Sequence, residues 1–246
     1  MYLAPFPLAP FPLAQALPTQ APGVFTGGAN VIAVLILLAE FGMLRQALLR
    51  DHIRLYMAQS ALIAILAVIV AAARHIPDLY VLAALTVALK VIVIPLLLRR
   101  LLRETDPVGA AAGGADIAGS GGLGEASTVL LAIVVAAFGF FAASRLGIRS
   151  DAAPVTALSV SLSVVLVAFV LMIHRRDVVS QAIGLFSLEN GISLAALVVA
   201  ASLPLILEVA LLFDLLLAVV VFGLLIRIHH GRGRSLSTAD LTRLRG

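Results

Sequence analysis

Polar and glycine-rich segments divide the chain into seven continuous apolar stretches. Each is close to the ~20 residues that a helix needs to cross the hydrocarbon core of a bilayer. The apolar residues run continuously rather than alternating with polar ones, which favours helices over the strands of a β-barrel. The pattern therefore predicts an all-α membrane protein with seven transmembrane helices, at residues 25–45, 55–73, 79–99, 126–144, 153–173, 178–200 and 204–226.

Composition supports a multi-pass membrane protein. Of the 246 residues, 62% are hydrophobic and 12% are charged, and the mean hydropathy is +1.13. A soluble domain carries about twice that share of charge. These values exclude a soluble enzyme, a nucleic-acid-binding domain and a disordered scaffold. Cysteine is absent, so disulfides and thiolate-ligated zinc or iron–sulfur sites are excluded, and we expect no cofactor.

The segments outside the apolar stretches suggest how the chain is organised. Residues 1–24 form a tail that holds six of the eleven prolines, and 104–125 form a Gly-rich linker. The linker contains G-x-G-x-x-G at 119–124, but no strand precedes it, so we interpret it as a flexible connection rather than a dinucleotide site. The predicted order is tail 1–24, three helices in 25–103, the linker, four helices in 126–228, and a tail at 229–246.

Arginines predict the orientation of the helices in the membrane. The first, third and fifth connections and the C-terminal tail hold thirteen arginines, whereas the other side holds three. Cytoplasmic loops carry the excess of Arg and Lys in membrane proteins. The N-terminus is therefore predicted to lie outside, and the C-terminus and the linker in the cytoplasm.

Ionisable side chains inside the predicted helices are the main candidates for function. A charge at the centre of a membrane helix costs ~2.5–3.5 kcal/mol on insertion scales, and such residues usually mark ion or proton routes. At 1.5 Å per residue, Lys90, Glu189 and Asp214 each lie roughly 15–16 Å from the end at which their helix enters, near the middle of a ~30 Å core. Glu208 lies on the outer half of the same helix as Asp214. We expect the first three to form one layer, although a structural pair with a spare carboxylate is the alternative.

Glu40 also lies in a predicted helix, but close to its cytoplasmic end. Arg45 and Arg50 follow it within ten residues. This spacing favours an interfacial ion pair over a role in function.

Neighbouring residues add three expectations. Ser193 lies one turn after Glu189 and is expected to hydrogen-bond to it, and Pro95 is expected to weaken the third helix after Lys90. Small residues every four positions allow another helix to approach closely. Such a stripe is formed by Ser187, Gly191 and Ala195.

Several motifs resemble one family of membrane subunits. Residues 184–191 (GLFSLENG) resemble its G-x-x-x-x-E-N-G segment, and Lys90 to Pro95 resembles its K-V-x-x-x-P element. Leu203-Pro204 to Glu208, followed by Asp214, is similar to its next helix, and 236–246 resembles its terminal L-x-x-x-x-L-T-x-L-[KR]-G. This is the hydrogenase-4 component E family, found in formate-hydrogenlyase-type and other group 4 hydrogenase complexes. Glu40 and the proline-rich start depart from it.

The last three predicted helices also resemble subunit K of NADH-quinone oxidoreductase and the C subunit of multi-subunit cation/proton antiporters. The resemblance implies a multi-pass subunit of the cell inner membrane without a catalytic centre of its own. Its implied partners are antiporter-like membrane subunits and cytoplasmic hydrogenase and iron–sulfur subunits. The implied proton-transfer residues are Lys90, Glu189, Glu208 and Asp214. A stand-alone secondary transporter and a purely structural anchor remain alternatives.

Overall fold

The computed structural model describes residues 24–46, 48–105, 124–146, 155–175 and 177–199, with the single positions 216 and 223. These residues are almost all helical and include no strand. The elements are α1 (Val24–Arg45), α2 (Leu49–Arg74), α3 (Asp78–Thr86), the π-helix η1 (Val87–Val93), α4 (Ile94–Thr105), α6 (Glu125–Arg145), α7 (Val155–His174) and α8 (Val178–Val199).

Six helices of the described chain are long and apolar enough to cross a membrane. Five are α1, α2, α6, α7 and α8, and the sixth is the continuous rod of α3, η1 and α4. They correspond to the first six predicted stretches, so the all-helical class is confirmed. The seventh stretch, 204–226, is described only at positions 216 and 223, so Glu208 and Asp214 lie outside the described residues.

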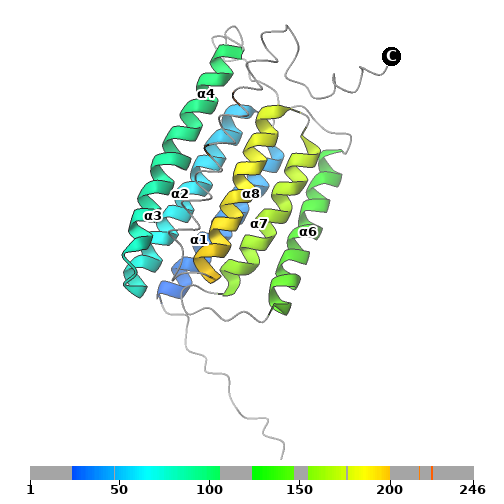
Figure 1. Ribbon diagram of the computed structural model, residues 1–246. Coiled ribbons are helices and arrows are strands. Elements are labelled where there is room, and N and C mark those ends of the chain that lie inside the picture. Colours follow the sequence, from blue (N-terminus) through cyan, green and yellow to red (C-terminus); the bar gives the residue numbers. More distant parts are fainter. Residues whose placement is uncertain are drawn as a thin grey trace, which may run out of the picture.

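The helices form a bundle in which α8 is central (Figure 1). Helix α8 packs against α7 on one side and α2 on the other, and α1 lies against α2 and α7. The rod of α3, η1 and α4 borders α2, whereas α6 packs on the far side of α7 (Figure 1). Most of α8 is buried and most of α6 is exposed. The polar residues of α8 therefore lie inside the bundle.

Glycines allow the close approach of α7 and α8. A Cβ on Gly191 would lie 2.8 Å from Val165 Cγ2 and 3.2 Å from the Ser161 carbonyl oxygen. Ser161 Oγ donates a hydrogen bond of 2.7 Å to the Gly191 carbonyl. Gly191 thus has the contact role predicted for it, but Ser187 of the same predicted stripe faces α1 and α2 instead.

Helix α2 begins earlier than the sequence pattern predicts. The apolar stretch begins at residue 55, whereas the helix begins at Leu49 and includes a polar first turn and a half. Arg54 and Asp51 form an exposed ion pair of 2.9 Å across one turn there. Hydropathy locates the apolar part of a helix, and here the helical hydrogen bonding continues into the polar end.

Candidate functional site

A buried ion pair joins the rod of α3, η1 and α4 to the central helix α8. Lys90 Nζ lies 2.8 Å from Glu189 Oε1, and the two side chains are 0% and 10% exposed. Lys90 Nζ also donates to Ser193 Oγ at 3.0 Å. Ser193 was expected to hydrogen-bond to Glu189, but the structure places its hydroxyl on the ammonium of the same pair. The three side chains thus form one compact polar group.

A π-helical turn presents Lys90 to α8. Lys90 is at the centre of η1, which ends two residues before Pro95. Proline has no N–H and its ring clashes with the carbonyl four residues earlier. The wider i→i−5 pattern avoids this clash, and Ile94 N–H accordingly donates to the Leu89 carbonyl. The expected weakening at Pro95 takes the form of a π-turn, a feature that is frequent at functional sites.

A second buried polar cluster joins α1, α2 and α8. Gln59 Nε2 donates to Glu40 Oε2 at 2.8 Å, and Ser187 Oγ donates to the same oxygen. Asn190 Nδ2 donates to Gln59 Oε1 at 3.0 Å and to Ser60 Oγ at 2.9 Å. All five side chains are completely buried. They tie the central helix to α1 and α2 by hydrogen bonds rather than by apolar contact alone.

The expected ion pair of Glu40 with Arg45 or Arg50 is wrong. Glu40 is buried and bonded to Gln59 and Ser187. Side chains on a helix tilt toward its N-terminus, so the carboxyl of Glu40 is directed away from the arginines at the C-terminal end of α1. The residues of α2 and α8 that donate hydrogen bonds to it are uncharged, so the positions of charged residues in the sequence do not indicate them.

Tyr56 lies between the two clusters. It is one turn before Ser60 on α2, is completely buried, and packs its ring on Phe186 of α8 with centroids 5.9 Å apart. Its phenol is close enough to Glu189 to interact with it electrostatically. Tyr56 thus adds a buried hydroxyl of α2 close to the ion pair.

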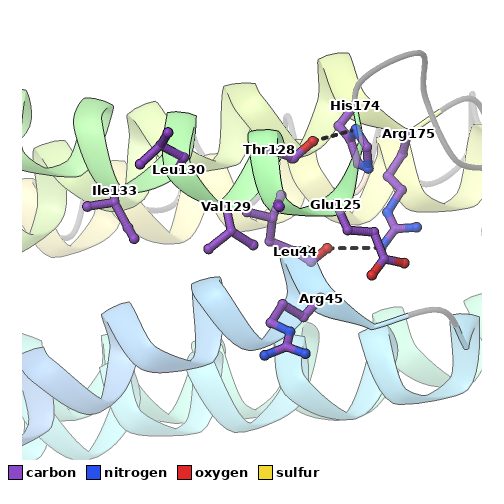
Figure 2. A pocket seen from close by; sticks show the side chains of 10 residues that line it. Leu44, Arg45, Glu125, Thr128, Val129, Leu130, Ile133, His174 and Arg175 are labelled. Carbon is purple, nitrogen blue, oxygen red and sulfur yellow. Dashed lines mark hydrogen bonds between the residues drawn. The ribbon is translucent and has the colours of Figure 1, made fainter.

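A separate pocket of about 510 Å³ lies where α1 and α7 end and α6 begins (Figure 2). Arg175 donates to the carbonyls of Leu44, at 3.0 Å, and Gln46, and so fastens the end of α1 to the α7–α8 connection. Burial lowers the pKa of Arg175, while the carboxylates of Asp177 and Glu125 oppose this shift. The first and fifth connections are therefore at the same end of the bundle, as the alternation of helices requires.

Thr128 and His174 face each other in this pocket, with Oγ1 and Nδ1 3.0 Å apart (Figure 2). Thr128, His174 and Arg175 bind backbone carbonyls or one another, so we interpret the pocket as a structural junction. Within the described ranges, no group of three or more His, Asp or Glu residues is placed to hold a metal ion. Two predicted site residues, Glu208 and Asp214, lie outside those ranges.

Part of the chain is similar to a known protein. The chain is 40% identical over 92 residues to a Mycobacterium tuberculosis protein described as "Uncharacterized protein Rv0085". The match covers 37% of this chain and 40% of the relative, so it spans less than half of either protein. No family model matches the chain, and no solved structure matches it.

Proposed function

We propose that the chain is a multi-pass inner-membrane subunit of a complex-I-related, group 4 hydrogenase-type complex, and that it supplies protonatable residues to a proton path. The observation that carries this proposal is the buried ion pair of Lys90 and Glu189. Its two members come from helices far apart in the sequence, each long and apolar enough to cross a membrane.

The energetics of buried ion pairs support a functional role. Replacing such a pair by apolar residues of similar volume is often neutral or stabilising by ~1–4 kcal/mol. An apolar bundle therefore gains little stability from Lys90 and Glu189. Ionisable residues within membrane helices are in general associated with ion or proton movement, and the lysine and glutamate fit that use.

The depth of the pair suits a path across the membrane. At 1.5 Å per residue, Glu189 lies about 16 Å along α8 and Lys90 about 18 Å along the rod that begins at Asp78. These helices are expected to enter from opposite faces, so both groups lie near the middle of a ~30 Å core. In the proposal, Asp214 and Glu208 of the seventh predicted helix continue the path outward.

The pair can change its contacts when a proton binds. Glu189 as a carboxylate attracts the Lys90 ammonium at 2.8 Å. A proton on Glu189 cancels that attraction, and Lys90 keeps its hydrogen bond to Ser193. Loss of the proton restores the ion pair.

The partners follow from the resemblance of residues 184–191 and 90–95 to hydrogenase-4 component E. Antiporter-like subunits would lie beside the chain in the membrane, and hydrogenase and iron–sulfur subunits would bind on the cytoplasmic side. This chain has no cysteine, so the thiolate-ligated redox centres belong to those partners.

Isolation of the tagged chain in a mild detergent tests this assignment. We expect iron–sulfur and nickel–iron hydrogenase subunits to co-purify with it, together with iron and nickel in the preparation. A single monodisperse protein without these metals would contradict membership of such a complex and would favour the stand-alone transporter.

A further inference from the structure

We infer that Glu40 is a second proton-binding group, which switches between a carboxylate and a carboxyl within the cluster of Gln59 and Ser187. As a step in transport, this inference rests on the proposed function. As a statement about proton binding, it stands on the geometry of the cluster alone.

No cation faces Glu40 from the described parts of the helices packed around it. The side chains that bond to it are Gln59 from α2 and Ser187 from α8, and both are neutral. The one buried cation within the neighbouring cluster, Lys90, is 2.8 Å from Glu189. Glu40 is 0% exposed, and its Oε1 accepts no hydrogen bond from the described residues. A buried carboxylate without a counter-ion is strongly disfavoured, and binding a proton relieves this.

The Ser187 hydroxyl is placed to serve both protonation states. Its oxygen is within hydrogen-bond distance of Glu40 Oε2 and, at 3.0 Å, of Gln59 Oε1. A hydroxyl has one hydrogen to donate and two lone pairs that accept. When Glu40 is a carboxylate, Ser187 donates to it.

When a proton binds to Glu40 Oε2, that O–H donates to Ser187 Oγ, and the Ser187 hydrogen turns to Gln59 Oε1. One proton is gained, no heavy atom has to move, and both states keep their hydrogen bonds.

The same geometry argues for a proton rather than a metal cation. The groups that approach Glu40 Oε2 are an N–H and an O–H, whose hydrogens carry partial positive charge. Alkali and alkaline-earth cations require a shell of oxygen ligands directed at the ion. Around Glu40 the Gln59 amide nitrogen takes one of those positions, while the amide oxygen accepts from Asn190.

Helix α8 links this group to the ion pair. Ser187 and Asn190 lie on either side of Glu189 in the sequence, and they bond to Glu40 and Gln59. The residues that flank Glu189 in the sequence thus hold the Glu40 cluster against the same helix.

Infrared difference spectroscopy of the full chain in lipid vesicles, recorded against pH, tests the inference. We expect a carbonyl band of a protonated carboxyl group that shifts in D₂O, is absent in Glu40→Gln, and persists in the matched control Glu125→Gln. Glu125 is exposed at the start of α6, outside the polar clusters. At constant pH, added sodium is expected to leave the band unchanged.

A second variant tests the inference even if Glu40→Gln does not fold. Ser187→Ala keeps the carboxyl but removes the hydroxyl, and we expect the Glu40 band to move in frequency. Identical spectra for the wild type, Glu40→Gln and Ser187→Ala would overturn the inference, and so would a band that sodium removes. These spectra do not depend on transport, so the outcome is separate from that of the proposed function.

Discussion

Ser187 and Glu189 lie two positions apart on α8, yet their side chains bind residues of different helices. Ser187 donates to Glu40 on α1, whereas Glu189 forms its ion pair with Lys90 on η1. Two residues along a helix correspond to a rotation of about 200°, so the side chains point to opposite sides of α8. The central helix thus divides the buried polar residues into two clusters and connects them.

Removal of one member of the ion pair should destabilise the bundle more than removal of both. Glu189→Leu leaves the Lys90 ammonium buried without its counter-charge, which costs about 3–5 kcal/mol. The double variant Lys90→Met/Glu189→Leu should recover most of that loss. Unfolding in detergent followed by circular dichroism measures both effects. Additive losses in the double variant would show that the pair does not interact.

Replacement of Gly191 by alanine should disturb the contact between α7 and α8. The added Cβ would lie 2.8 Å from Val165 Cγ2, and overpacking of this kind costs about 1–3 kcal/mol. Gly28→Ala is the matched control, because no atom lies within 4 Å of a Cβ at that position. The melting temperature should fall for Gly191→Ala and stay unchanged for Gly28→Ala. Equal melting temperatures would contradict the close packing.

Pro95→Ala should convert the π-turn towards α-helical geometry. The new N–H can donate to the Val91 carbonyl four residues earlier, and this register competes with the i→i−5 bond of Ile94. We expect a more stable helix, a rotated Lys90 and weaker proton transport. Distances between spin labels on α4 and α8 report the rotation. Unchanged distances together with full transport would contradict a role for the π-turn.

Arg175→Lys should weaken the junction at the end of α1 without affecting the ion pair. Lysine keeps the charge but lacks the planar fork of donors that reaches Leu44 and Gln46. Loss of a hydrogen bond from a charged group costs about 1.5–3 kcal/mol. The melting temperature should fall, whereas proton transport by the folded complex should not change. Arg54→Lys, whose side chain is 71% exposed, should alter neither.

The sequence predicts much of the fold because apolar length is a strong signal for membrane-type helices. It also indicates that Lys90 and Glu189 lie at one level, since helix entry points and a fixed rise determine depth. The role of Glu40 could not be predicted in the same way. Its partners on α2 and α8 are neutral, and their meeting depends on which helices pack together. The proline at 95 signals a distortion, but not that the distortion is a π-turn.

Proton translocation into inverted membrane vesicles that contain the whole complex tests the central claim most directly. We predict that the Glu189→Gln complex assembles normally and retains electron transfer, but that its rate of acidification falls at least tenfold. Glu125→Gln should acidify the vesicles at the wild-type rate. Wild-type acidification by assembled Glu189→Gln would contradict the proposed proton path.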